Sequence, residues 1–158
     1  MIICQSVTEQ SVLQKIYFLR SQVFVEEQGV SAEEEFDEFE ETSIHWAANL
    51  GDEVIACARY RRTEKGFKVE RMAVREDFRK QGIGRYLLSS ILETLRLKIA
   101  LSQQAEVQEP KPEIYLHAQV QALPFYLAQG FVQVGEIFYE ACIPHYRCIF
   151  QDFEGRVP

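Results

Sequence analysis

Two glycines within a group of basic residues, between positions 75 and 85, form the segment of this sequence best suited to binding an anion. Gly82 and Gly84 lack a Cβ atom, so a bulky anionic group can come close to the main chain there. A helical pattern begins at Ile83, and the free N–H groups and dipole of a first helical turn favour negative charge. Four cationic side chains surround the glycines: Arg75, Arg79, Lys80 and Arg85. We therefore predict a diphosphate-binding loop over residues 79–84.

The spacing of these glycines differs from two common phosphate-binding motifs. A dinucleotide-binding turn needs Gly-x-Gly-x-x-Gly, and a P-loop needs Gly-x4-Gly-Lys followed by Ser or Thr. Neither pattern occurs around Gly82. The glycine pair alone leaves one alternative open, which is a tight turn with a solvated basic edge.

Hydrophobic periodicity and turn residues indicate the elements that must position this loop. The predicted strands cover residues 2–7, 44–50, 53–63, 67–75, 113–118, 131–134 and 137–142. The predicted helices cover residues 83–101, 122–129 and a segment from an N-cap near Thr8 to a stop at Gly29. The acidic segment 30–43 is expected to be a loop or short helix held by Phe36 and Phe39, and residues 102–112 a surface loop. This order predicts one α+β domain over residues 1–158, with helices packed on a mixed sheet.

The strand before the glycine loop has an irregular pattern. Phe67 and Val69 are apolar on one phase, whereas Met72 and Val74 are apolar on the other. A period of two cannot shift without an inserted residue, so the pattern predicts a β-bulge near Glu70-Arg71. The alternative is a strand that is buried on both faces.

Composition and charge exclude several classes of function. The net charge of −7 argues against binding to nucleic acid or to an anionic membrane, and no stretch is apolar enough to span a bilayer. The four cysteines fit neither a zinc site nor a disulfide framework, and no metal is expected. They indicate reduced thiols in the cytoplasm, and the first residues do not resemble a signal peptide.

The charge is unevenly distributed along the chain. Residues 26–41 hold nine acidic residues and no Lys or Arg, while residues 59–85 hold most of the positive charge. This distribution suits an anionic cofactor that meets a cationic or amine substrate. A solvated acidic loop is the alternative.

Two motifs in this order resemble the GNAT superfamily of N-acyltransferases. Glu70-Arg71-Met72-Ala73-Val74, running into Arg79-x-x-Gly82-x-Gly84, is similar to the acyl-CoA strand and loop of that family. Gln119-x-x-Ala122-x-x-Phe125-Tyr126-x-x-x-Gly130-Phe131 is similar to its later helix motif. Four further stretches resemble the ElaA/YjcF-like subgroup: residues 20–29, 35–38, 116–119 and 143–145. Two residues depart from the pattern, Glu40 in place of an aspartate and Gln119 in place of an asparagine that contacts the cofactor in many members.

The resemblance implies a fold, a cosubstrate and a set of binding residues. The fold is a central, mostly antiparallel, splayed mixed sheet of about six to seven strands with about four helices, and the cosubstrate is acetyl-CoA. Backbone groups of Met72, Ala73 and Val74 are expected to pair with the pantetheine arm like an added strand. The remaining contacts to the cofactor are expected from Arg79, Lys80, Gln81, Gly82, Ile83, Gly84, Arg85 and Gln119.

The implied chemistry is direct attack of an amine on a thioester, which needs a base for the amine and an acid for the leaving thiolate. Tyr126 fits the acid by resemblance, with a core tyrosine as the alternative. Glu70 is the candidate base because it sits at the predicted bulge, with an ion pair to Arg59 or Arg71 as the alternative. His117 and His145 are weaker candidate bases. Three residues are candidates for contacting the acceptor: Glu26, Asp37 and His145.

Three functions from different classes follow from these residues. The first is an acetyl-CoA-dependent N-acetyltransferase that acts on a primary amine of a small substrate, a cationic one included, with protein amines as a variant. The second is a non-catalytic acyl-CoA-binding regulatory module. The third is a protein-interaction domain in which the glycine loop no longer binds a ligand. Neither nucleic acid nor membrane is expected as a partner, and a monomer or a homodimer is equally compatible with the sequence.

Overall fold

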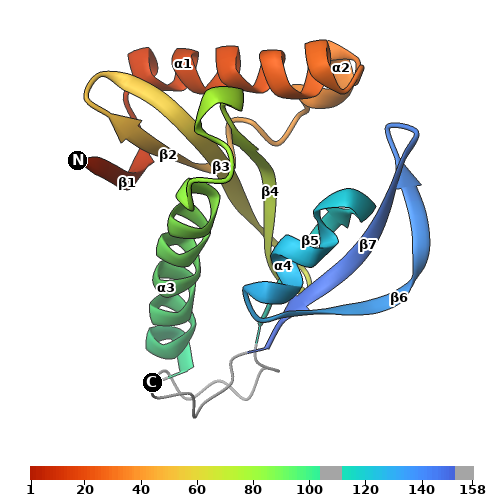
Figure 1. The fold of residues 1–158 in the computed structure, drawn as a ribbon. Coiled ribbons are helices and arrows are strands. Elements are labelled where there is room, and N and C mark those ends of the chain that lie inside the picture. Colours follow the sequence, from red (N-terminus) through yellow and green to blue (C-terminus); the bar gives the residue numbers. More distant parts are fainter. Residues whose placement is uncertain (104–111, 152–158) are drawn as a thin grey trace.

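The structure is a computed structural model that describes residues 1–103 and 112–151 (Figure 1). Within these residues, seven strands form one sheet in the order β1-β2-β3-β4-β5-β7-β6. The first four strands are β1 (Ile2–Val7), β2 (Ile44–Leu50), β3 (Glu53–Thr63) and β4 (Gly66–Val74), and each is antiparallel to its neighbour. β5 (Glu113–Gln119) runs parallel to β4, and β7 (Ile143–Phe150) lies between β5 and β6 (Phe131–Glu140). The predicted mixed, mostly antiparallel sheet is confirmed.

Helices cover both faces of the sheet (Figure 1). α3 (Ile83–Gln103) buries Leu87, Ile91 and Leu95 against one face, and α1 (Gln10–Arg20) buries Ile16 and Leu19 against the other. Burying one such side chain contributes about 1.5–3 kcal/mol. Alternate residues of β3 join the two cores, because successive side chains of a strand point to opposite faces.

Shorter helices extend these layers. α1 continues directly into the π-helix η1 (Ser21–Glu27), and Gly29 (φ +71°) ends it as predicted. α2 (Ala32–Glu35) follows, with the Ser31 hydroxyl accepting a hydrogen bond from the main-chain N–H of Glu34. The 3₁₀ turn η2 (Glu76–Phe78) precedes the glycine loop, and η3 (Val120–Ala122) leads into α4 (Leu123–Ala128).

The sheet divides in its centre, between β4 and β5. The pairing of these strands ends at Val69 and Leu116, although both strands continue beyond that point. The register of β4 with β3 shifts there as well, because Arg71 and Met72 together oppose Ala58. Arg71 has a φ of +54°, which confirms the predicted β-bulge at Glu70-Arg71. The two strands therefore diverge as they leave the bulge.

Two local predictions are wrong. The last hairpin does not turn at Gly135-Glu136: β6 runs through these residues with an irregularity, and the chain turns at Ala141-Cys142 instead. Both turn residues have positive φ, as a tight two-residue hairpin turn requires, but neither belongs to the types that signal such a turn. The N-cap of α1 is Glu9 rather than Thr8, and its side chain makes no capping bond.

The cysteines agree in part with the sequence. All four are free thiols, and Cys57 and Cys148 are buried as expected, whereas Cys142 is exposed in the β6–β7 turn. The predicted surface loop lies mostly outside the described residues.

Candidate active site

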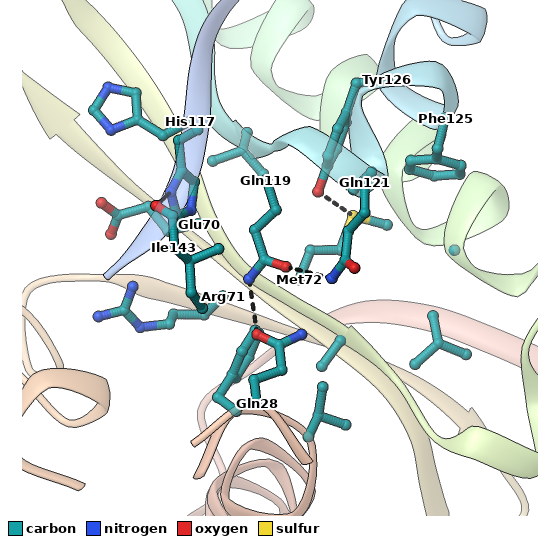
Figure 2. A pocket seen from close by; sticks show the side chains of 18 of the residues that line it. Gln28, Glu70, Arg71, Met72, His117, Gln119, Gln121, Phe125, Tyr126 and Ile143 are labelled. Carbon is teal, nitrogen blue, oxygen red and sulfur yellow. Dashed lines mark hydrogen bonds between the residues drawn. The ribbon is translucent and has the colours of Figure 1, made fainter. Parts of the chain in front are cut away.

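A cleft with a volume of about 1080 Å³ opens where β4 and β5 separate. β4 and the glycine loop line one wall, and β5, α4 and the β6–β7 turn line the other. Figure 2 shows Glu70 and His117 on one side of the view, Tyr126 and Phe125 on the other, and Gln119 between them. We call the region around Glu70 and His117 the histidine end, and the region around Tyr126 and the glycine loop the glycine end.

The glycine loop forms an open turn at the start of α3. Lys80 and Gly82 both have positive φ, +61° and +80°. A Cβ atom on Gly82 would meet no atom within 4 Å, so the space beside this residue is free. α3 begins at the next residue, and the N–H groups of its first turn lack intrahelical partners. Every predicted loop residue except Gln81 lines the cleft.

Neighbouring side chains hold this turn in place. Arg79 donates a hydrogen bond from Nε to the carbonyl oxygen of Val74 at 2.9 Å, and from Nη2 to the carboxylate of Glu27 at 2.8 Å. The guanidinium therefore ties the loop to β4 and to η1. A Cβ atom on Gly84 would stand 3.4 Å from side-chain atoms of Met72 and Val74, so Gly84 allows α3 to lie close to the strand.

Tyr126 reaches the bulge from the opposite wall. Its hydroxyl donates towards Sδ of Met72 at 3.8 Å (Figure 2), and sulfur is a weak acceptor. Burial raises the pKa of Tyr126 to about 12, with a smaller contribution from Cys148. The phenol therefore keeps its proton at neutral pH. Met72 itself has no partner residue in the pairings of β4 with β3 or β5.

Gln119 bridges the two walls at the end of β5. Its Nε2 donates to Oε1 of Gln28 at 2.7 Å, and its Oε1 accepts from Nε2 of Gln121 at 3.0 Å (Figure 2). Gln28 follows η1, so this contact joins elements that are far apart in the sequence. Gln119 lies in the cleft with Met72, Ala73 and Val74, and their contacts with a cofactor stay predictions.

Glu70 lines the histidine end, but its carboxylate is surrounded by cations. It accepts hydrogen bonds from Arg59 at 2.9 Å and Arg61 at 3.1 Å, and it pairs with Lys68 at 2.9 Å. Burial alone would raise its pKa, but Lys68, Arg61 and Arg59 together lower the pKa to about 2. A carboxylate with this pKa accepts a proton poorly at neutral pH. The geometry favours the alternative interpretation, an ion pair with Arg59, over the predicted base.

The acidic segment is docked on the sheet by ion pairs between 2.6 and 3.1 Å long. We call this set the arginine network, and its members are Glu35, Asp37, Glu40, Arg20, Arg59 and Arg71. Arg20 and Arg59 are 1% and 0% exposed, so their charges depend on these carboxylates. Three carboxylates of the segment are therefore bound to arginine within the protein, whereas Glu33, Glu34, Glu38 and Glu41 are exposed.

This network changes the interpretation of two predicted acceptor contacts. Asp37 lines the cleft, but both of its oxygens bind Arg59, and Arg71 adds a contact at 3.1 Å. Burial would raise the pKa of Asp37, and the hydrogen bond and charge of Arg59 outweigh it and lower the pKa. Glu26 is exposed and does not line the cleft, in contrast to the prediction. Its neighbour Glu27 lines the cleft instead.

Two histidines line the histidine end, and Nδ1 of each ring makes a hydrogen bond. Nδ1 of His117 lies 2.6 Å from Oε1 of Glu140, and Nδ1 of His145 lies 2.7 Å from the carbonyl oxygen of Ile143. The ring of His145 stacks on Phe138 at 5.9 Å between centroids, and the ring of His117 meets Phe138 edge-on at 4.8 Å. Glu140 was not among the predicted site residues, because the hairpin was expected to turn at Gly135-Glu136 and turns at Ala141-Cys142.

Three comparisons place this architecture among known proteins. A family model described as "Acetyltransferase (GNAT) domain" matches residues 4–148. "Uncharacterized N-acetyltransferase YjcF" of Bacillus subtilis (strain 168) is 32% identical over 134 residues, which cover 84% of this chain and 88% of that protein. The crystal structure of Escherichia coli ElaA has a TM-score of 0.79 and 28% identity, and the match covers 96% of this chain and 100% of that one.

A further solved structure resembles this chain in fold alone. It is a Bacillus subtilis acetyltransferase in complex with CoA, with a TM-score of 0.67 and 17% identity over 97% of this chain and 100% of that one. None of the helices within residues 1–103 and 112–151 is long and apolar enough to cross a membrane.

Proposed function

The chain belongs to the GNAT acetyltransferase family, and on that basis we propose that it transfers the acetyl group of acetyl-CoA directly to a primary amine of a small molecule. The observation that carries this proposal is the open glycine loop at the start of α3, which leads along the cleft to an unpaired bulge and to a protonated tyrosine. Free thiols, with Cys142 exposed, suit a reducing compartment, so we place the reaction in the cytoplasm.

The residues of the glycine end fit a CoA-type ligand. The free space at Gly82 and the first N–H groups of α3 suit a diphosphate. The main chain of β4 beyond the bulge has lost β5 as a neighbour, so it offers hydrogen-bonding groups to an extended pantetheine arm. These are the groups that the sequence assigned to Met72, Ala73 and Val74.

The family chemistry assigns separate roles to the bulge and to Tyr126. Bound acetyl-CoA supplies a thioester whose carbonyl carbon accepts the amine nitrogen. A main-chain N–H near Met72 donates to the carbonyl oxygen as negative charge develops. The pKa of Tyr126, about 12, lies above that of an ordinary thiol, roughly 8.5. Tyr126 therefore acts on the departing sulfur as a hydrogen-bond donor.

The acceptor is proposed to be a small amine. Of the two carboxylates expected to contact a cationic acceptor, Asp37 is already paired with Arg59, and Glu26 does not line the cleft. Two alternative functions also require the CoA site. One is a non-catalytic acyl-CoA-binding regulatory module, and the other is an acetyltransferase that acts on protein amines.

Thermal unfolding with acetyl-CoA, followed by turnover, tests this function. At about a hundredfold excess over its dissociation constant, a ligand stabilises the fold by about 2.7 kcal/mol, or roughly 5–10 °C for a chain of this size. Tyr126→Phe should keep this shift and reduce kcat by roughly 10- to 100-fold, because only the hydroxyl is lost. Absence of the shift would overturn the CoA site. A shift without release of CoA in the presence of any amine would support the binding module.

A further inference from the structure

We propose that His117, oriented by Glu140, accepts the proton of the attacking amine. This inference rests on the proposed function, because it assigns the base for that reaction. The two side chains come from different strands, β5 and β6, and both line the histidine end of the cleft. Figure 2 shows Gln119 between His117 and Tyr126, so an amine between these two side chains lies in the middle of the cleft.

The pair fixes the tautomer of the imidazole. A carboxylate only accepts hydrogen bonds, so Nδ1 of His117 carries the proton in the 2.6 Å contact with Glu140. Burial would raise the pKa of Glu140, but the hydrogen bond and charge of His117, with Lys68 and His145, lower it. The carboxylate is therefore ionised at neutral pH. In the neutral ring Nε2 then has a free lone pair, as a base requires.

Glu140 also distinguishes His117 from the other candidates. When a histidine takes up a proton, a carboxylate stabilises the resulting charge better than a carbonyl group does. His145 has only the carbonyl of Ile143 at its Nδ1 and is 8% exposed. Glu70 is held as a carboxylate by three cations. His117 is the one of the three that has both a free nitrogen and a compensating charge.

Charged groups from every neighbouring strand face this pair. On β5, the ring of Tyr115 lies 6.0 Å from that of His117. On β7, Arg147 stands opposite His117 in register, but its guanidinium binds Glu113 and lies over the Tyr115 ring. β4 contributes Lys68, which pairs with Glu70, and Glu70 also binds Arg59 and Arg61 of β3. His145 of β7 also acts on Glu140. Glu140 is therefore the carboxylate available to compensate an imidazolium at His117.

The proton and electron pairs balance in this scheme. An alkylammonium gives one proton to Nε2 of His117, the neutral nitrogen then forms a bond with the carbonyl carbon, and its second proton leaves to solvent as the amide forms. The carbon–sulfur bond breaks, and its electron pair stays on sulfur, which is hydrogen-bonded to Tyr126 and takes a proton from solvent. The imidazolium returns a proton to solvent through its partly exposed edge, so the site is restored without a net change of charge.

The test measures CoA release over a range of pH with two kinds of nucleophile. The probes are 2-phenylethylamine and putrescine, which are mainly protonated at neutral pH, and hydroxylamine, which is mainly neutral. His117→Gln should lower kcat/KM for the two alkylamines by about 100-fold at neutral pH and abolish the acidic limb of the profile. The loss with hydroxylamine should be smaller than about tenfold. A purely structural role would lower all three rates equally.

Matched variants and a spectroscopic measurement complete the design. Glu140→Gln should lower alkylamine turnover by about tenfold, because the carboxylate no longer stabilises the imidazolium. Glu136→Gln is the control, since Glu136 is an exposed carboxylate on the same strand outside the cleft. The ¹⁵N signals of the ring of His117 should show the Nδ1–H tautomer in the native protein.

Each outcome decides between the proposals. Turnover of alkylamines by His117→Gln within about threefold of the native rate, or an Nε2–H tautomer, would overturn the base and leave the acetyltransferase standing. An equal loss with hydroxylamine would also overturn it. No turnover by the native protein with any amine would remove the proposed function, and the base would fall with it.

Discussion

Glu70→Gln should lower the stability of the fold by about 3 kcal/mol at neutral pH. The folded protein holds the pKa of Glu70 at about 2, against an ordinary value of 4.5. This difference corresponds to about 3 kcal/mol of interaction that favours the ionised form. The side chain is 7% exposed, so solvent screens little of this interaction. The loss should lower the midpoint of thermal unfolding by roughly 6–12 °C.

The direction of the pKa shift of Glu70 determines how its contribution to stability depends on pH. The pKa of Glu70 is depressed in the folded state, so its contribution is fully present above a pH of about 4.5. It declines as the pH falls through about 2, and below that pH the carboxyl is protonated in both the folded and the unfolded state. The difference in stability between native protein and Glu70→Gln should therefore be constant from neutral pH to about 5 and shrink below that.

Urea unfolding of both proteins at several pH values measures this difference, with Glu136→Gln as the control for an exposed carboxylate. The control should change the free energy of unfolding by less than about 0.5 kcal/mol. A loss below about 1 kcal/mol for Glu70→Gln would refute the ion-pair interpretation. Loss of the acidic limb of the rate profile in Glu70→Gln, with stability unchanged, would restore Glu70 as the base.

Two glycine substitutions separate binding from folding. Gly82→Val should weaken acetyl-CoA binding by more than about tenfold, because the side chain fills the space proposed for the diphosphate. Gly51→Val is the control, because Gly51 has a similar positive φ of +60° and open surroundings. This control variant should bind acetyl-CoA normally. Similar affinities would refute the anion site. Gly66→Ala should unfold or strongly destabilise the chain, because its Cβ would stand 2.1 Å from the carbonyl oxygen of Glu113. Gly135→Ala is the control, with φ +75° and no neighbour within 4 Å, and it should lower the midpoint of thermal unfolding much less. Equal midpoints for these two would show that β4 and β5 move apart freely.

The sequence was sufficient for the features that depend on local pattern. The slip between Val69 and Met72 predicted the bulge because side chains on a strand alternate strictly, and an inserted residue leaves a visible trace. The glycine loop was predictable because a glycine at position 82 permits the positive φ of the turn, and the hydrophobic pattern indicates a helix that begins at Ile83. These two features fix the position of the cleft.

The partners of the acidic segment were not predictable, because the contacts of the arginine network join residues 15–37 positions apart along the chain. Nine acidic residues without a cation suggested a surface for a cationic substrate, but Arg20 and Arg59, from elements before and after the segment, bind three of its carboxylates: Glu35, Asp37 and Glu40. Similarly, Glu140 reaches His117 only because β6 continues through Gly135 and turns at Ala141-Cys142. A pattern of single residues contains no information on such long-range pairing.

Arg71 connects the arginine network to the β-bulge that lines the cleft. Arg71 is the bulge residue with positive φ, and its guanidinium binds the main-chain oxygens of Glu34 and Glu35 at 2.9 and 3.1 Å. The strain of that backbone conformation is therefore offset by contacts with the acidic segment. The same segment binds Arg59, which also binds Glu70 on the other side of the bulge. The carboxylates of Glu35, Asp37 and Glu40 thus contact the bulge region through Arg59 and Arg71, and the charge of these three carboxylates is used within the protein.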